Sequence, residues 1–147
     1  MSIITVYGDL LKQRSVHAIV NTVNCVGVMG KGIALQSKKA WPANFRAYYN
    51  ACNAGKVKPG RMFIYYTGNQ YIINFPTKDH WREDSQIEFI QDGLVDLIKQ
   101  IKELQILSIA IPPLGCGNGG LNWLEVKPLI VSAFTAVPEV TVYLFEP

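Results

Sequence analysis

The chain has 147 residues, 49% of them hydrophobic and 17% charged, with a formal net charge of +3. This size and composition predict one globular domain, while the lack of a long apolar run or signal-peptide pattern excludes a membrane-spanning protein and predicts a cytoplasmic location. The weak positive charge permits an anionic ligand but does not distinguish phosphate from nucleic acid.

Strands and helices are predicted to alternate along the chain. Apolar runs and period-two alternation predict six strands, at residues 3–7, 18–20, 62–66, 71–75, 106–111 and 140–145. Helical periodicity predicts four helices, at residues 32–39, 42–53, 85–102 and 123–136. A turn at residues 67–70 predicts an antiparallel hairpin between the third and fourth strands. This order favours an α/β fold with a mixed sheet and helices on both faces.

The predicted helix at residues 85–102 carries the clearest pattern. Ser85 followed by Glu88 predicts a capping box at its start. Its apolar stripe is expected to face the sheet and contains Ile87, Ile90, Leu94, Leu97, Ile98 and Ile101.

The unusual residues follow predicted strands. Asp9 follows the first strand, residues 21–32 follow the second, Thr77 and Lys78 follow the fourth, and residues 115–120 follow the fifth. Ligands of such sheets bind outside the carboxyl ends of parallel strands, so four loops are expected to converge on one crevice.

The first glycine-rich loop, residues 21–34, leaves a strand and enters a helix. Bare N–H groups at a helix N-terminus bind phosphate oxygens, and the side-chain amides of Asn21 and Asn24 suit sugar hydroxyls. The alternative is a turn in which the glycines only allow the chain to bend. The loop matches neither the P-loop pattern nor the GxGxxG fingerprint, which disfavours a kinase or a dehydrogenase.

The second glycine-rich loop, residues 112–121, follows an apolar strand and is expected to be another anion cradle. Its alternative is a flexible surface loop. A Cys116 nucleophile with His80 as base is a minor hypothesis, since a small buried thiol is commoner. Cys25, Cys52 and Cys116 form no CxxC pair, so we expect reduced thiols.

Lys78 lies just past a strand end, in the string NFPTKDHWR. A lysine is most often a solvated surface residue, which is the alternative here. Inside a closed crevice, a desolvated amine can instead attack an electrophilic sugar carbon. Large aromatics, including Trp41, Trp81 and Trp123, are expected to be mainly core anchors, although they could stack on a base.

Four strings resemble the ADP-ribose-binding loops of the macrodomain family: YGDL at 7–10, NTVNCVGVMGKGIA at 21–34, NFPTK at 74–78 and PPLGCGNGGL at 112–121. The last three are similar to the branch that holds DarG-type antitoxins and the terminal ADP-ribose protein glycohydrolase. The resemblance implies a three-layer α/β/α macrodomain with a central mixed six-stranded sheet. It spans nearly the whole chain, which is expected to be one domain over 1–147, either alone or as the N-terminal part of a longer natural protein.

The resemblance also implies roles for particular residues. Lys78 would be catalytic, as nucleophile or electrostatic catalyst at the distal ribose, while Asp9 would accept from the adenine amine. Asn21 and Asn24 would face the distal ribose. The implied substrate contacts are Gly8, Asp9, Leu10, Asn21, Thr22, Val23, Asn24, Gly30, Lys31, Gly32, Ile33, Ala34, Thr77, Leu114, Gly115, Cys116, Gly117, Asn118 and Gly119. No metal and no cofactor are implied.

One position departs from the protein-directed branch, because Gly119 stands where that loop supplies an aspartate. A base nitrogen of thymidine leaves as a delocalised anion and needs less protonation than an ester does. The favoured function is therefore removal of ADP-ribose from thymidine in single-stranded DNA, with a DarT-type toxin as partner and no membrane. The alternatives are a non-catalytic ADP-ribose reader and a hydrolase of protein-linked mono-ADP-ribose.

Overall fold

The computed structural model describes residues 2–147 and contains the predicted succession of strands and helices. The strands are β1 (Ser2–Val6), β2 (Ala18–Val23), β3 (Phe63–Tyr66), β4 (Tyr71–Pro76), β5 (Ser108–Ile111) and β6 (Thr141–Phe145). The α-helices are α1 (Gly32–Ala40), α2 (Pro42–Asn53), α3 (Ile87–Leu104) and α4 (Trp123–Phe134). A 3-10 helix, Leu10–Lys12, follows β1.

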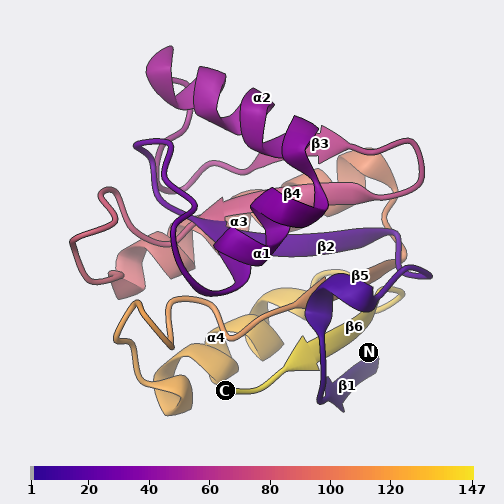
Figure 1. Ribbon diagram of the computed structural model, residues 1–147. Helices are drawn as coiled ribbons and strands as arrows, with labels where there is room; N and C mark the ends of the chain where they lie inside the picture. Colours follow the sequence, from indigo (N-terminus) through magenta and orange to yellow (C-terminus); the bar gives the residue numbers. More distant parts are fainter. Residues whose placement is uncertain (1) are drawn as a thin grey trace.

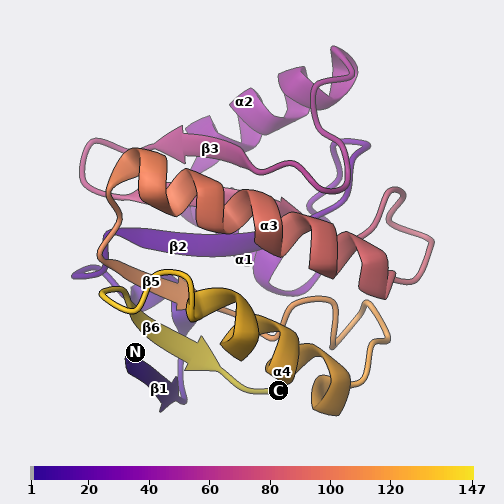
Figure 2. The same cartoon turned by 180° about the vertical axis from the view of Figure 1, so that it is seen from behind.

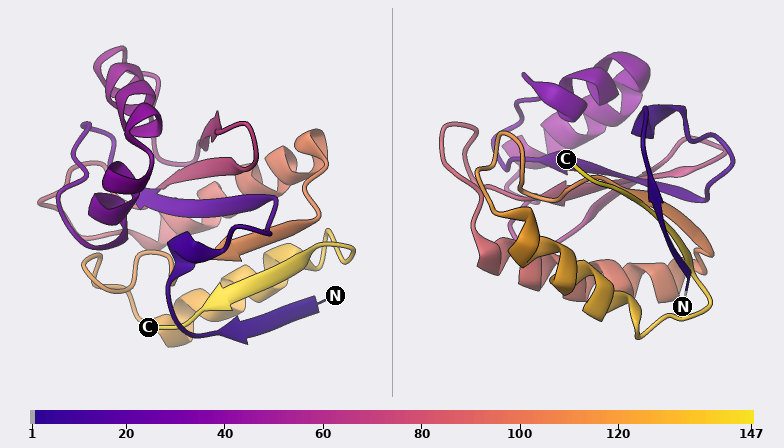
Figure 3. Two further views of the ribbon diagram at one scale, coloured as in Figure 1. Left: turned by 45° about the vertical axis from the view of Figure 1, so that its right-hand side comes forward. Right: turned by 90° about the horizontal axis from the view of Figure 1, so that it is seen from below.

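The strands form one six-stranded sheet in the order β1-β6-β5-β2-β4-β3. All neighbouring pairs are parallel except β3 and β4, which form the predicted antiparallel hairpin. Helices α1 and α2 cover one face of the sheet, and α3 and α4 cover the other (Figures 1 and 2). The view from below in Figure 3 places the sheet between these two helical layers. The predicted α/β/α fold with a mixed sheet is confirmed.

The apolar stripe of α3 is confirmed, since five of its members are buried: Ile90, Leu94, Leu97, Ile98 and Ile101. They pack in one cluster with β-strand residues such as Ile73 and Ile109, which are fully buried. No helix within residues 2–147 is long and apolar enough to cross a bilayer.

Two local predictions were wrong. Helix α3 has Gln86 as its N-cap, without a side-chain capping bond, so Ser85 and Glu88 form no capping box. The Ser85 amide instead donates to the carbonyl of Gly119 at 2.9 Å, which keeps Ser85 in the preceding loop. Strand β2 extends to Val23, beyond the predicted end at residue 20, because it pairs with β4 as far as Pro76.

Candidate ligand-binding groove

The predicted crevice is present at the carboxyl ends of β2, β4 and β5. Three loops gather at this edge of the sheet, namely residues 24–31, 77–86 and 112–122 (Figure 1, and the left view of Figure 3). They enclose a cavity of about 760 Å³. Its lining contains fifteen of the predicted site residues: Thr22, Val23, Asn24, Gly30, Lys31, Gly32, Ile33, Ala34, Thr77, Lys78, Gly115, Cys116, Gly117, Asn118 and Gly119.

The first glycine-rich loop presents the N-terminus of α1 to the cavity. Lys31 is the N-cap and makes no side-chain capping bond, so the first-turn N–H groups at Gly32, Ile33 and Ala34 lack intrahelical partners. These three residues line the cavity. Free N–H groups and the helix dipole both favour an anion here.

Gly32 is required by its backbone conformation. Its φ is +58°, and a Cβ added at this position would lie 3.4 Å from the Asn118 side-chain nitrogen. The two glycine-rich loops are therefore in close approach across the cavity. A glycine lets the start of α1 adopt this conformation and leaves room for the second loop.

The second glycine-rich loop supplies a second set of donors. Within residues 2–147, the backbone N–H groups of Gly117, Asn118 and Gly119 donate to no protein acceptor. The loop itself is fixed by bonds from Cys116 N to Pro113 O at 3.0 Å and from Leu121 N to Gly115 O at 2.9 Å. Donors held on a fixed loop are suited to the oxygens of a diphosphate.

Gly119 cannot carry a side chain in this loop. A Cβ added there would overlap the carbonyl oxygen of Gly115 and the hydroxyl of Ser85. The predicted lack of an acidic group at this position is thus built into the backbone path, and no substitution alone could place a carboxylate there without moving the loop.

Lys78 lies between the two glycine-rich loops. Its Nζ donates to the carbonyl oxygen of Asn118 at 3.3 Å, so the lysine lies on the same side of the molecule as Gly117, as expected. The first loop is tied to the Lys78 segment by Thr77 N to Val23 O at 3.0 Å and by Cys25 N to Asp79 O at 2.8 Å. The Lys78 side chain is half-buried rather than enclosed.

Asn24 lines the cavity, but most of the hydrogen bonds of its side chain are made within the protein. Its Oδ1 accepts from the amides of Val26 and Val28 and from the Tyr48 hydroxyl, at 3.1, 3.3 and 2.9 Å. Its Nδ2 donates to Val28 O at 2.7 Å, which leaves one N–H for a ligand. Asn24 therefore shapes the loop at the expected ribose position.

A second cavity, of about 450 Å³, continues the groove toward β1. Both cavities share four lining residues, Gly32, Ile33, Pro112 and Pro113. Gly8, Asp9 and Leu10, predicted for the adenine end, line this second part. Asp9 Oδ1 accepts from Leu11 N at 2.9 Å, and its Oδ2 makes no hydrogen bond within the described chain.

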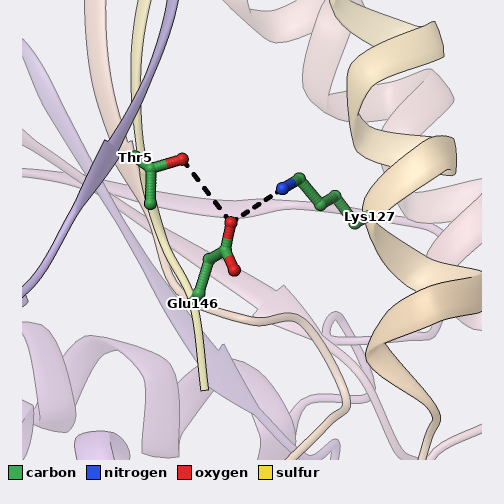
Figure 4. A network of polar contacts seen from close by, with 3 residues as sticks. All are labelled: Thr5, Lys127 and Glu146. Carbon is green, nitrogen blue, oxygen red and sulfur yellow. Dashed lines mark hydrogen bonds and ion pairs between the residues drawn. The ribbon is translucent and has the colours of Figure 1, made fainter.

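Glu146 is a second carboxylate on this part of the groove. It forms an ion pair with Lys127 at 2.7 Å and accepts from the Thr5 hydroxyl at 3.5 Å (Figure 4). The hydrogen bond from Lys127 lowers the pKa of Glu146, so this carboxylate is ionised at neutral pH.

Charge is therefore separated along the groove. The larger cavity is lined by three cations, Lys31, Lys78 and Arg82, and by no carboxylate. The smaller cavity is lined by two carboxylates, Asp9 and the Lys127-paired Glu146, and by no cation. Such a groove favours a ligand with an anionic middle and a hydrogen-bond-donating end.

Two predicted contacts are not on the groove surface. Asn21 lies inside β2 rather than in the loop, is fully buried, and donates through Nδ2 to Asn74 Oδ1 at 3.0 Å. Its placement in a loop was wrong because β2 pairs with β4 along its whole length, with Asn21 opposite Asn74. Leu114 is also fully buried and packs in the core behind the second loop.

The thiols offer little nucleophilic character. Burial raises the pKa of Cys116, whose Sγ lies 3.5 Å from the carbonyl of Leu114. The Nδ1 of the proposed base, His80, accepts from Arg82 N at 3.1 Å and lies in a turn on the 77–86 loop. All three cysteines are free. Among residues 2–147 no group of three or more His, Cys, Asp or Glu side chains is arranged to hold a metal ion.

Trp81 and Arg82 were missed as site residues. Both line the larger cavity, and Trp81 is 44% exposed, so it is not the core anchor that was expected. Trp41 and Trp123 do pack against core clusters. The only sequence signal for Trp81 was its place three residues after Lys78 in a loop predicted to reach the ligand edge.

Comparison with known proteins finds relatives that match almost the whole chain. The DNA ADP-ribosyl glycohydrolase of Mycobacterium tuberculosis is 54% identical over 144 residues, 95% of this chain and 41% of that protein. The solved macrodomain of M. tuberculosis DarG has a TM-score of 0.97 and 52% identity, covering 99% of this chain and 97% of that one. Thermosipho africanus DarTG, solved in complex with ADP-ribose, has a TM-score of 0.92 and 33% identity, and the match covers 99% of this chain and 42% of that chain.

The chain spans about two fifths of the length of the curated relatives that it matches first. A family model described as Macro domain matches residues 20–130, which contain both glycine-rich loops and Lys78. On the sheet order, the two loops and this match, the chain belongs to the macrodomain family.

Proposed function

We propose that this chain hydrolyses the bond between ADP-ribose and a thymidine base of single-stranded DNA. The adenine would lie at Asp9, whose free carboxylate oxygen suits the exocyclic amine. The diphosphate would lie between the α1 N-terminus and the free amides of residues 117–119. The distal ribose would then lie beside Lys78.

One observation carries the catalytic part of the proposal. The Lys78 Nζ is held 3.3 Å from the Asn118 carbonyl, inside a cavity that no carboxylate lines. In the reaction, water adds its hydroxyl to the anomeric carbon, the bond to the base nitrogen breaks, and the base takes up a proton. A fixed cation beside that carbon can stabilise the negative charge that develops on the departing base.

The lack of an acidic group at Gly119 requires a leaving group that can depart as a stabilised anion. A poor leaving group needs a general acid, which contributes about 10²–10⁴-fold to a rate. Gly119 has no room for the side chain of an aspartate. A pyrimidine base that departs as a delocalised anion meets this requirement, and so does a carboxylate, so the choice of DNA over protein rests on the relatives named below.

The names of the relatives agree with this proposal, since the M. tuberculosis protein is a DNA ADP-ribosyl glycohydrolase and the T. africanus neighbour is a DarTG protein bound to ADP-ribose. We therefore extend the proposal to a cytoplasmic antitoxin that reverses the modification made by a DarT-type toxin. Residues 1–147 would act in it as one ADP-ribose-binding domain.

Lys78→Ala tests the proposal, with Lys56→Ala as the control, because Lys56 is exposed and lies outside the groove. Release of ADP-ribose from modified thymidine DNA is followed by mass spectrometry, and binding of free ADP-ribose by calorimetry. We expect Lys78→Ala to bind ADP-ribose within about threefold of wild type and to lose at least about 100-fold in release, on the scale of a removed electrostatic catalyst.

Other outcomes separate the alternatives. Binding of ADP-ribose with no release by the wild-type protein would identify a reader. Release from modified glutamate protein but not from DNA would identify a protein-directed hydrolase. Unchanged release by Lys78→Ala would remove Lys78 from the mechanism.

A further inference from the structure

Next to Lys78, the groove has a stacked group of side chains that ADP-ribose alone does not require. His80 and Trp81 stack with ring centroids 5.5 Å apart and an interplanar angle of 30°. The Arg82 guanidinium carbon lies 4.6 Å from the centroid of the Trp81 ring. His80 is itself held by accepting the Arg82 amide at 3.1 Å. We call these three residues the rim stack.

The rim stack borders the catalytic end of the groove. Trp81 and Arg82 line the larger cavity, which also contains Lys78, and neither lines the smaller cavity where adenine is proposed to bind. The rim stack therefore lies where the group attached to the distal ribose must leave the groove. This placement rests on the proposed function, because it assumes that the distal ribose lies at Lys78.

Arg82 is oriented but not neutralised. Its side chain is exposed, and within residues 2–147 it forms no ion pair, although Glu83 and Asp84 follow it in the chain. An arginine held over an aromatic ring has less conformational freedom to lose on binding, and its planar donors suit a phosphate. Trp81 is itself exposed, so its ring supports the Arg82 guanidinium instead of packing in the core.

We propose that the rim stack is a strand contact, in which Arg82, positioned by Trp81, binds a backbone phosphate of the DNA next to the modified thymidine. Arg82 then increases the affinity for a DNA strand over that for an isolated ADP-ribosylated nucleoside. Trp81 is a positioning residue that acts through Arg82.

The test compares Arg82→Ala with Arg61→Ala, an exposed arginine outside the groove. Binding and release are measured with two ligands, an ADP-ribosylated single-stranded oligonucleotide and ADP-ribosyl thymidine without flanking phosphates. We expect Arg82→Ala to bind the oligonucleotide about tenfold more weakly, which corresponds to roughly 1.4 kcal/mol. Any loss of nucleoside binding or turnover in Arg82→Ala should be clearly smaller than the loss with the oligonucleotide, and Arg61→Ala should match wild type with both ligands.

Salt dependence provides a readout that a merely structural role would not change. One lost phosphate contact on a single strand should reduce the slope of log K against log salt by about 0.7. Trp81→Ala should weaken oligonucleotide binding in the same direction, and Trp81→Phe should restore most of it, because Phe retains a ring beneath the guanidinium.

The strand contact is overturned if Arg82→Ala weakens the binding of both ligands equally, weakens the binding of neither, or leaves the salt slope unchanged. Failure of the proposed hydrolysis is separate. If the wild-type protein releases no ADP-ribose while Arg82→Ala still weakens oligonucleotide binding more than nucleoside binding, the strand contact holds and the hydrolase proposal is wrong.

Discussion

Gly119→Ala probes the packing of the second glycine-rich loop. Gly119 does not have a positive φ, so the expected effect is steric: the new Cβ overlaps the Gly115 carbonyl and the Ser85 hydroxyl. Overpacking of this kind costs about 1–3 kcal/mol. Moving the loop also breaks the bond from Ser85 N to Gly119 O, worth about 0.5–1.5 kcal/mol. The two costs together are roughly 1.5–4.5 kcal/mol.

Ligand binding needs the native loop, so part of this cost should appear as weaker affinity. A change of about 2 kcal/mol is ~30-fold in Kd, and calorimetry with ADP-ribose measures it directly. The same cost of about 2 kcal/mol in folding would lower Tm by roughly 4–8 °C for a domain of this size. Gly55→Ala is the control, because Gly55 has a φ of +70° with no atom near its Cβ position. That variant should lose stability and keep its affinity.

The refuting result for this reasoning is a Gly119→Ala protein with wild-type affinity and wild-type Tm. Such a protein would mean that the loop relaxes without cost. The free amides of residues 117–119 would then not be a preorganised binding site for diphosphate.

Three further predictions concern the groove and the thiol of Cys25 in the first glycine-rich loop. Lys78→Arg keeps the cation but cannot form a covalent adduct, so we expect release well above that of Lys78→Ala, and equal loss in both would indicate a nucleophile. Asp9→Asn retains the capping oxygen but replaces an acceptor with a donor. Calorimetry should show that Asp9→Asn weakens the binding of ADP-ribose by about tenfold and the binding of the inosine analogue far less. Burial, then Asp79, raises the pKa of Cys25 to about 12. Because the folded pKa is the higher one, stability is full below about pH 8.5 and falls above it toward pH 12, and urea unfolding should show a smaller fall in Cys25→Ala.

The order of elements was predictable because each signal was local. The stripe of α3, the turn between β3 and β4, and the glycine-rich strings each depend on a few consecutive residues. The rule that loops meet at the carboxyl ends of parallel strands then placed Lys78 near residues 115–119 without knowledge of any contact.

Features that depend on pairing partners distant in sequence were not predictable. Asn21 looked like a loop residue because asparagine is unfavourable in strands, yet it is paired with Asn74 across two buried strands. Trp81 looked like a core residue because tryptophans usually are, yet its turn projects beyond the sheet. Ser85 had a capping sequence, but its amide was already used by Gly119.

The two ends of the groove differ in the charge of their lining residues, and in the proposed complex this difference sets the direction of the ligand. Asp9 disfavours phosphate in the smaller cavity, where the charge of Glu146 is compensated by Lys127, while the α1 N-terminus and Lys31 attract phosphate to the larger one. An adenine at Asp9 and a diphosphate at α1 leave the distal ribose only one place, beside Lys78 and within reach of the rim stack. A ligand bound in the opposite direction would place its phosphates next to the Asp9 carboxylate. In the proposed complex, the bond to be cleaved, and the group attached to it, would therefore point toward Arg82.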